Sequence, residues 1–247
     1  MATKILWSGL TGRVGQEAAR IAVGRSDLAI VAGIKRRATG ADDVTLGGIA
    51  SPVWYQFCNL IKIATDEFCD FDVIVDFSHA DAFNNVLRLA IRTGKPLVIG
   101  TTGLSNRQLA TLYDATSRIP IFRDDNMRFV VKRFIDEATA LAKQGKTGDL
   151  HENFYRGRKI LPSQESNILR ARIREETGRT IEVKSAATLN SDGRAWEWKY
   201  CGMKMQISGL DDLAHDALEI AKFMATQPVQ NGKFYTLEQI WPSLADG

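Results

Sequence analysis

The segment KILWSGLTGRVG, residues 4–15, places a short apolar run directly before three glycines. The run has the composition of a buried strand, and residues 13–23 that follow it have apolar side chains at helical spacing. A strand, a glycine turn and a helix in this order are what a dinucleotide-binding fingerprint requires, because glycines let the backbone approach a pyrophosphate. The spacing is GxxGxxG rather than GxGxxG, so a plain turn between strand and helix is the alternative.

The same alternation of short apolar runs and helical patterns continues through the first half of the chain. It predicts an α/β fold with a doubly wound parallel sheet that is buried on both faces. Residues 38–68 show no sustained period, and we expect a loop with at most one strand there. The expected strands are 4–8, 28–34, 71–77, 96–100 and 119–122, and the expected crossover helices are 13–23 and 80–91.

The pattern changes after Asp125. Residues 129–142 predict a long helix. Two segments, 181–189 and 197–207, alternate apolar and polar residues on either side of Asn190-Ser191-Asp192-Gly193. We therefore expect an antiparallel hairpin in a sheet that has one open face.

The chain returns to helical spacing over residues 210–224, and a last short helix extends through Ile240. These changes predict two domains. The first is 1–126, with 210–247 packing back onto it, and the second is 127–209, an α+β domain.

Composition excludes several classes of protein. The 247 residues are 45% hydrophobic and 25% charged, which is typical of a globular protein, and the net charge of +3 is too small to indicate a nucleic-acid partner. No apolar run reaches the roughly 18 residues that a membrane helix needs. The three cysteines form no CxxC pair and the three histidines lie far apart, so we expect no metal site and a cytoplasmic protein.

A basic run follows the second expected strand. About 20 residues beyond the glycines, an NAD site usually has an Asp or Glu that binds the ribose 2′-hydroxyl. This chain has Lys35-Arg36-Arg37 there, and cations suit a 2′-phosphate. The sequence therefore predicts NADPH over NADH, with a solvated basic loop as the alternative. Arg13 is either a further phosphate contact or a surface residue.

Four short segments occur together in one family. They are the glycine turn, Val75-Asp76-Phe77-Ser78, the VIGTTG segment at 98–103, and Asp125-Asn126-Met127. In this order they resemble the dihydrodipicolinate reductases (4-hydroxy-tetrahydrodipicolinate reductases), and the resemblance covers nearly the whole chain. It implies an N-terminal Rossmann domain, a second α+β domain that binds substrate and whose sheet forms a homotetramer, and hydride transfer from a nicotinamide to an imine-like ring.

The resemblance also implies where the cofactor lies. Phe77, Gly100, Thr102 and Asn126 match family positions that line the nicotinamide and its ribose, and strand ends in open parallel sheets bind ligands. For Asp76 and Ser78, capping of the strand end is the alternative to cofactor contact. The candidate cofactor contacts are Gly9, Thr11, Gly12, Arg13, Val14, Lys35, Arg36, Phe77, Ser78, Gly100, Thr101, Thr102 and Asn126.

The substrate motif departs from the family pattern. The family has Glu-x-His-His-x-x-Lys-x-Asp-x-Pro-Ser-Gly-Thr, and this chain has ENFYRGRKILPSQE over 152–165. Both histidines are replaced by aromatic residues, the lysine by Arg158, and the Gly-Thr of the anion turn by Gln164-Glu165. A carboxylate at Glu165 repels a substrate carboxylate, which disfavours the dicarboxylate substrate of lysine biosynthesis.

Acidic residues gather in the segments that the resemblance assigns to substrate. They suit a cationic substrate, such as an imine derived from a basic amino acid, for example a dehydroarginine. Solvated loop acids are the alternative. The candidate substrate contacts are Asp124, Asp125, Arg128, Glu152, Ser163 and Glu165.

These residues predict an NADPH-dependent imine reductase. We assign Arg158 as a carboxylate clamp and Tyr155 as a proton relay, with Lys159 helping to organise a proton from water. Two other functions remain open. One is an authentic 4-hydroxy-tetrahydrodipicolinate reductase, and the other is an NADPH-binding regulatory protein without catalysis.

Overall fold

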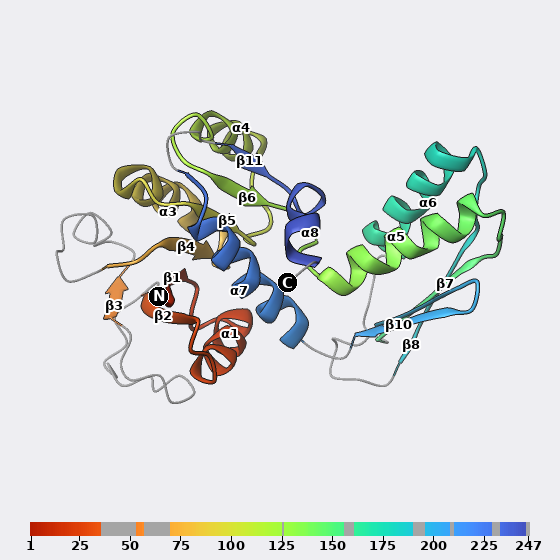
Figure 1. Ribbon diagram of the computed structural model, residues 1–247, viewed down its shortest axis with the longest axis horizontal. Coiled ribbons are helices and arrows are strands. Elements are labelled where there is room, and N and C mark those ends of the chain that lie inside the picture. Colours follow the sequence, from red (N-terminus) through yellow and green to blue (C-terminus); the bar gives the residue numbers. More distant parts are fainter. Residues whose placement is uncertain are drawn as a thin grey trace. The chain divides into compact units, whose positions relative to one another are not determined.

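The computed structural model describes residues 1–35, 53–56, 70–124, 126–155, 161–189, 196–207, 210–228 and 233–245. The chain divides into two compact units, one made of Met1–Met127 with Leu213–Gly247 and the other of Arg128–Asp212. Each unit contains its own β-sheet (Figure 1). None of the helices in the described segments is long and apolar enough to cross a membrane.

The first unit is built on a seven-stranded parallel sheet in the order β11-β6-β5-β4-β1-β2-β3. The chain winds outward from β1 in both directions, which confirms the predicted doubly wound α/β fold. The order reverses between β1 and β4, and open α/β sheets bind ligands at such a point. The strands are β1 (Thr3–Ser8), β2 (Leu28–Lys35), β3 (Val53–Gln56), β4 (Val73–Asp76), β5 (Leu97–Ile99), β6 (Ile121–Arg123) and β11 (Phe234–Tyr235).

Helices cover both faces of this sheet. In Figure 1, α3 and α4 lie on one side of it, and α1 and α7 lie on the other. The sequence patterns predicted α1, α3, α7 and α8 but not α4, which begins at a capping box formed by Ser105 and Gln108. The helices are α1 (Arg13–Val23), α3 (Ala80–Thr93), α4 (Asn106–Ala115), α7 (Asp211–Ala225) and α8 (Leu237–Ala245).

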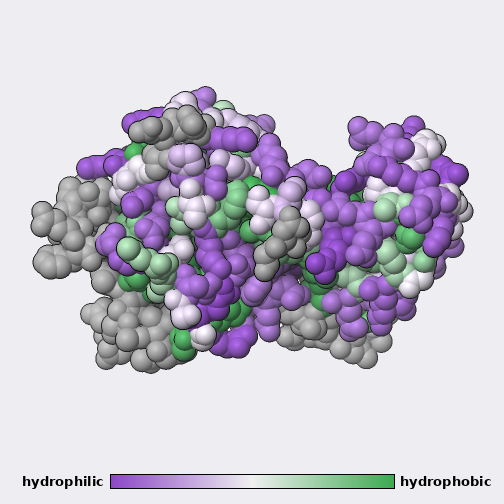
Figure 2. Space-filling view, viewed as in Figure 1, coloured by the Kyte–Doolittle hydropathy of each residue, from purple (hydrophilic) through white to green (hydrophobic). Residues whose placement is uncertain are grey.

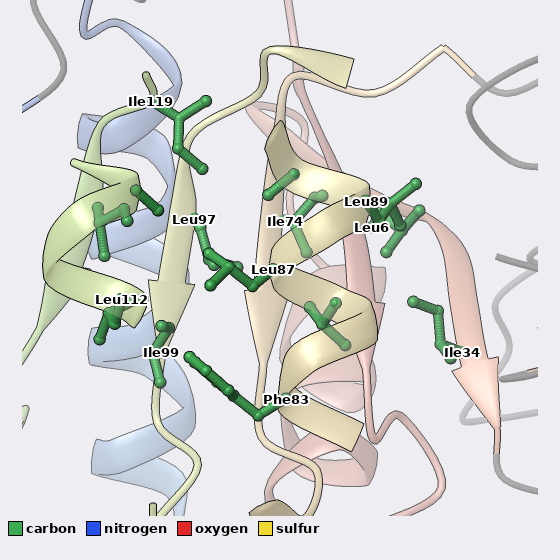
Figure 3. Close-up of a cluster of buried hydrophobic side chains, with 14 of the residues drawn as sticks. Leu6, Ile34, Ile74, Phe83, Leu87, Leu89, Leu97, Ile99, Leu112 and Ile119 are labelled. Atoms are coloured by element: carbon green, nitrogen blue, oxygen red, sulfur yellow. The ribbon is translucent and has the colours of Figure 1, made fainter. Parts of the chain in front are cut away.

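A hydrophobic cluster fills the space between the sheet and the helices α3 and α4 (Figure 3). Phe83 and Leu87 of α3 and Leu112 of α4 pack there with Leu6 and Ile74 from the strands, and all five are buried. Burying such a side chain stabilises the fold by about 1.5–3 kcal/mol. This packing holds the ends of β1 and β4 in fixed positions.

The second unit has a mixed four-stranded sheet in the order β10-β9-β7-β8. Two helices, α5 (Phe129–Lys143) and α6 (Gln164–Thr177), pack against one face of it. Phe134 of α5 contacts Trp198 of the sheet, with the ring centroids 5.4 Å apart. The strands are β7 (Leu150–Tyr155), β8 (Val183–Leu189), β9 (Trp196–Tyr200) and β10 (Met203–Ile207).

The predicted hairpin between residues 181–189 and 197–207 is wrong. Strand β7 pairs in parallel with β8 and antiparallel with β9, so β7 lies between the two segments. The hairpin of this sheet joins β9 to β10 through Cys201 and Gly202, whose φ angles of 46° and 85° are those of a type I′ turn. The predicted turn at 190–193 lies outside the described residues.

Polar side chains cover most of the described surface on the face shown in Figure 2. Apart from Met1, the large apolar side chains that are exposed among the described residues are Val23 on α1, Tyr113 on α4 and Ile168 on α6. The homotetramer stays a prediction.

Candidate cofactor site

A cavity of about 350 Å³ opens at the carboxyl ends of β1, β2 and β4. The order of the strands reverses at this place, between β1 and β4. The position is therefore the one that the fold favours for a ligand. The residues around it include Gly9, Thr11 and Gly12 of the glycine turn, Ile34 of β2, and Phe77, Ser78, His79 and Asp81 beyond β4.

The glycine turn packs backbone against backbone. Gly9 has a φ of +83°, and a β-carbon on it would lie less than 3.0 Å from the carbonyl oxygen of Phe77. A β-carbon on Gly15 would lie equally close to the backbone of Leu10. Side chains are therefore excluded at both positions, and the turn keeps β1, α1 and the segment after β4 close together.

The N-terminus of α1 suits an anion. Its N-cap is Gly12, which supplies no side-chain cap, and its first turn contains no acidic residue. The amides and the helix dipole at this end favour a negatively charged group, and no carboxylate of the first turn competes for them. The turn and the cavity therefore fit the pyrophosphate of a dinucleotide.

The ring of Phe77 forms part of the cavity wall. A β-carbon on Gly100 would lie less than 3.0 Å from three atoms of this ring, and the ring stacks on Trp7 with centroids 5.5 Å apart. Gly100 directly follows β5, so the segment after β4 and the segment after β5 meet at this ring. Phe77 and Gly100, both predicted to contact the cofactor, are thus brought together.

A buried carboxyl group lies behind the cavity. Asp76, the last residue of β4, has an exposed fraction of 0% and accepts hydrogen bonds from Ser78 and Thr101. Burial raises the pKa of Asp76, and the hydrogen bonds from these two residues partly offset that shift. The structure therefore shows the carboxyl group of Asp76 bound to the loops at the strand ends, which agrees with capping of the strand end, the alternative to cofactor contact.

Other predicted cofactor residues lie near the strand ends without lining the cavity. Arg13 and Thr102 are exposed, Val14 is half-buried, and Thr101 is buried against Asp76. Lys35 ends β2, but its side chain and the whole of Arg36 lie outside the described residues. The contact between the basic run and a 2′-phosphate stays a prediction.

Two polar residues at the cavity were missed from the sequence. His79 is the N-cap of α3 and its Nδ1 accepts a hydrogen bond from the amide of Asp81 at 3.3 Å. Both side chains line the cavity. The available signal was their place directly after the third expected strand, where ligands of parallel sheets bind.

The carboxylate of Asp124, which was predicted to contact substrate, is bound by two main-chain amides. Its Oδ1 accepts a hydrogen bond from the amide of Asn126 at 3.1 Å, and its Oδ2 accepts one from the amide of Leu237 at 2.9 Å. Leu237 is the first residue of α8, so the carboxylate of Asp124 satisfies an amide at the start of that helix. Asp125 lies outside the described residues.

Glu152 and Ser163 were predicted to contact substrate, and the structure buries both of them within the second unit, where they bind each other. Glu152 has an exposed fraction of only 2%, and Ser163 is the buried N-cap of α6. The carboxylate of Glu152 accepts hydrogen bonds from the amide and Oγ of Ser163, at 2.9 and 2.8 Å, from Ser185 Oγ at 2.6 Å, and from Ser166 Oγ. The carboxylate of Glu152 is thus bound inside the fold by four donors and lies at the N-terminus of α6.

The remaining predicted substrate and catalytic residues also belong to the second unit. Glu165 lies in the first turn of α6, where an acid is favourable, and Arg128 is the N-cap of α5, with its guanidinium 5.6 Å from the ring centroid of Trp196. The side chain of Tyr155 and the whole of Arg158 and Lys159 lie outside the described residues. Their catalytic roles stay predictions.

Comparison with protein families places the first half of the chain in a known family. The family described as "Dihydrodipicolinate reductase, N-terminus" matches residues 3–127. A 4-hydroxy-tetrahydrodipicolinate reductase of Alkalilimnicola ehrlichii is 31% identical over 209 residues, which are 80% of this chain and 74% of that protein. One of Caldanaerobacter subterraneus is 29% identical over 66% of this chain, and the match spans only 60% of that relative.

Comparison with solved structures supports the fold. A dipicolinate-bound dihydrodipicolinate reductase from Paenisporosarcina has a TM-score of 0.72 at 15% identity, and the match covers 97% of this chain and 100% of that one. A myo-inositol 2-dehydrogenase from Lactobacillus plantarum has a TM-score of 0.58 at 12% identity and covers 99% of this chain and 94% of that one. At these identities the likeness concerns the fold alone.

Proposed function

Because the chain belongs to the dihydrodipicolinate reductase family, we propose that it is an NADPH-dependent reductase that transfers hydride to the C=N bond of a small amino-acid-derived imine. The observation that carries the proposal is the cavity between the glycine turn and the end of β4. Its walls combine an N-terminus of a helix without a side-chain cap, which suits a pyrophosphate, and an aromatic ring.

When bound, NADPH supplies the hydride. The backbone of the glycine turn and the first amides of α1 hold the pyrophosphate, and Phe77 and Gly100 shape the wall for the nicotinamide. Lys35 and Arg36 select the 2′-phosphate and so favour NADPH over NADH. Held in this way, the cofactor is positioned for transfer, and positioning supplies a large share of rate enhancement.

The substrate half of the proposal rests on the altered motif. Arg158 clamps a substrate carboxylate, and Tyr155 relays a proton with help from Lys159. The charge argument for a cationic substrate is weakened, because Asp124 and Glu152 bind groups of the chain itself. The imine of a basic amino acid, such as a dehydroarginine, therefore enters the proposal as one member of a substrate panel.

A second candidate function is an authentic 4-hydroxy-tetrahydrodipicolinate reductase. It is favoured by relatives of that name, which include one 31% identical over 80% of this chain. It is disfavoured by the replacement of both motif histidines and of the motif lysine at positions 154, 155 and 158. A third candidate, an NADPH-binding regulatory protein, follows from the same replacements.

Oxidation of NADPH, measured with a panel of imines, tests these candidates against one another. The panel contains 4-hydroxy-tetrahydrodipicolinate, imines of basic amino acids and imines of neutral amino acids. Turnover of an amino-acid imine but not of the dicarboxylate supports our proposal, and efficient turnover of the dicarboxylate supports the second candidate. Tight binding of NADPH without oxidation by any member supports the third.

Charge reversal tests the choice of cofactor. The double substitution Lys35→Glu with Arg36→Glu should weaken binding of NADPH far more than binding of NADH, because only NADPH carries the 2′-phosphate. Arg107→Glu with Arg118→Glu is the matched control, since both arginines are exposed and lie outside the cavity lining. Equal loss of both nucleotides in the Lys35 and Arg36 variant contradicts the selection that we propose.

A further inference from the structure

The carboxyl group of Asp76 connects two loops at the carboxyl edge of the sheet. The β4 loop (residues 77–79) follows β4, and the β5 loop (residues 100–105) follows β5. Asp76 Oδ1 accepts hydrogen bonds from Ser78 Oγ at 2.5 Å and from the Ser78 amide at 3.2 Å. Asp76 Oδ2 accepts one from Thr101 Oγ1 at 2.9 Å.

The two loops also contact each other directly, which closes a ring of hydrogen bonds. The amide of Ser78 donates to Thr101 Oγ1 at 3.0 Å. A hydroxyl group has one proton to donate, and this bond occupies Thr101 Oγ1 as an acceptor. Its own proton has two acceptors on Asp76, Oδ2 at 2.9 Å and the main-chain carbonyl at 3.2 Å, so Asp76, Ser78 and Thr101 hold one another in a defined arrangement.

No cation among the described residues forms a salt bridge with this carboxyl group, although it is fully buried. Burial of a carboxylate without a cation is costly, and its pKa is accordingly raised. Hydrogen bonds from both loops are what stabilise the group. Any movement that separates the loops therefore leaves a buried polar group unsatisfied, which is unfavourable.

Both loops carry residues that shape the cavity. Ser78 lines it, and the ring of Phe77 lies where Gly100 lacks a side chain. The main chain reinforces the connection, since the amide of Gly100 donates to the carbonyl of Asp76 at 2.9 Å and the amide of Phe77 donates to that of Ser8 at 3.0 Å. The hydrogen bonds among Asp76, Ser78 and Thr101 thus lie directly behind the cavity wall that the side chain of Phe77 forms.

We propose that Asp76 is a positioning residue of the cofactor site, whose carboxyl group holds Ser78 to Thr101 and thereby fixes the ring of Phe77 against Gly100. This inference rests on the proposed function, because it assigns the fixed wall to a nicotinamide cofactor. Asp76 itself is buried and acts through the two loops.

Substitutions of Asp76 and of Thr101 test this role. Asp76→Ala removes the carboxyl group, and Thr101→Val removes only the hydroxyl while keeping the shape of the side chain. Each breaks the bond between Asp76 and Thr101 that joins the two loops, and each should raise the dissociation constant of NADPH by about tenfold, the effect of losing one charge-assisted hydrogen bond. Asp76→Asn should restore most of the affinity, because Thr101 Oγ1 can donate to the main-chain carbonyl of residue 76 instead and accept from the new amide group. Asp114→Asn, at an exposed position on α4, is the control and should bind as the wild type does.

The double variant Asp76→Ala with Thr101→Val separates a shared role from independent ones. If both residues act through the same set of hydrogen bonds, the double variant binds NADPH about as weakly as either single variant. Independent effects would instead multiply to about a hundredfold loss. Multiplied effects, or unchanged affinity in Asp76→Ala, overturn the inference.

Hydrogen exchange in the protein without cofactor provides a second readout. The amides of Ser78 and Gly100 should exchange faster in Asp76→Ala and Thr101→Val, and at wild-type rates in Asp114→Asn. Unchanged exchange at both amides overturns the inference even if the wild type binds NADPH. If the wild type binds neither nucleotide, the proposed function is wrong and the positioning role falls with it, whereas wild-type binding with unaltered variants contradicts this inference alone.

Discussion

The ring of Phe77 occupies the space that a side chain on Gly100 would fill. The same ring stacks on the buried Trp7, with 16° between the ring planes. The two strands that flank β4 therefore determine the position of this ring, since Trp7 belongs to β1 and Gly100 follows β5 directly. A change at either neighbour must move the ring and the cavity wall with it.

Gly100→Ala should destabilise the fold and weaken NADPH binding through this contact. The new methyl group displaces the ring of Phe77 from Trp7, and overpacking of this kind costs about 1–3 kcal/mol. In a Phe77→Ala background the same substitution should cost much less, because the space is then vacant. Urea unfolding of the two single variants and the double variant measures this coupling. Additive effects would show that the two residues do not compete for this space.

The glycine turn makes a matched prediction. Gly9 and Gly103 both have positive φ, at +83° and +76°, but only a β-carbon on Gly9 would meet backbone atoms, those of Phe77 and Ser78. Gly103→Ala should therefore cost about 1 kcal/mol of unfolding free energy for the backbone conformation alone. Gly9→Ala should cost at least 2 kcal/mol more, since the backbone must shift as well. Equal losses in urea unfolding would contradict the tight packing of the turn.

Glu152 provides a test of structural against substrate-binding roles. In Glu152→Gln the NH₂ group of the new side chain faces hydroxyl and backbone groups that donated hydrogen bonds to the carboxylate. Because donors then face a donor, the free energy of unfolding should fall by about 2 kcal/mol. Glu175→Gln, at an exposed position of the same unit, should change it by less than about 0.5 kcal/mol. If Glu152→Gln instead leaves stability intact and alters only substrate binding, the capping role is wrong.

Acid should weaken a polar cluster between the start of β2 and α7. Asp27 accepts hydrogen bonds from Arg25 at 2.6 Å and from Lys222 of α7 at 2.5 Å. These cations, Arg25 first, lower the pKa of Asp27 below its ordinary value of 3.8. A depressed pKa contributes stability above the unfolded value, and this contribution is lost as the pH falls through the folded value. Asp27→Asn should thus be less stable than the wild type at neutral pH.

The stability difference should shrink as the pH falls below 3.8, because Asp27 of the unfolded chain then takes up a proton that the folded carboxylate, with its lowered pKa, still resists. Chemical unfolding of both proteins at neutral and acidic pH measures it. Asp114→Asn, which changes an exposed acid that forms no salt bridge with the described residues, should match the wild type throughout. A constant difference between Asp27→Asn and the wild type would exclude the ionic origin.

The parallel sheet was predictable because its strands are buried on both faces and read as apolar runs. The second sheet was harder, for reasons that two of its elements show. Strand β7 buries Glu152 between Leu150 and Phe154, so a charged residue interrupts the apolar alternation. The turn between β9 and β10 has Cys201 at a positive φ, where Asn, Asp or Gly is usual, and so carries no turn signal.

The candidate cofactor site was predictable in part. The glycine turn, Phe77 and Ser78 line the cavity as expected from their places at strand ends. The roles of Asp124 and Glu152 were not predictable, because an acid that caps a helix and an acid that faces a substrate look alike in sequence. Only their hydrogen-bond partners distinguish them, and the partners of Glu152 are far along the chain, at residues 163, 166 and 185.

Calorimetric titration of the wild-type protein with NADPH tests the central claim most directly. The account predicts one site per chain with a dissociation constant within about 1 µM to 1 mM, the range usual for small-molecule ligands of enzymes, and weaker binding in Gly100→Ala. Absence of binding at millimolar NADPH, or binding that Gly100→Ala leaves unchanged, would contradict the assignment of the cavity to this cofactor.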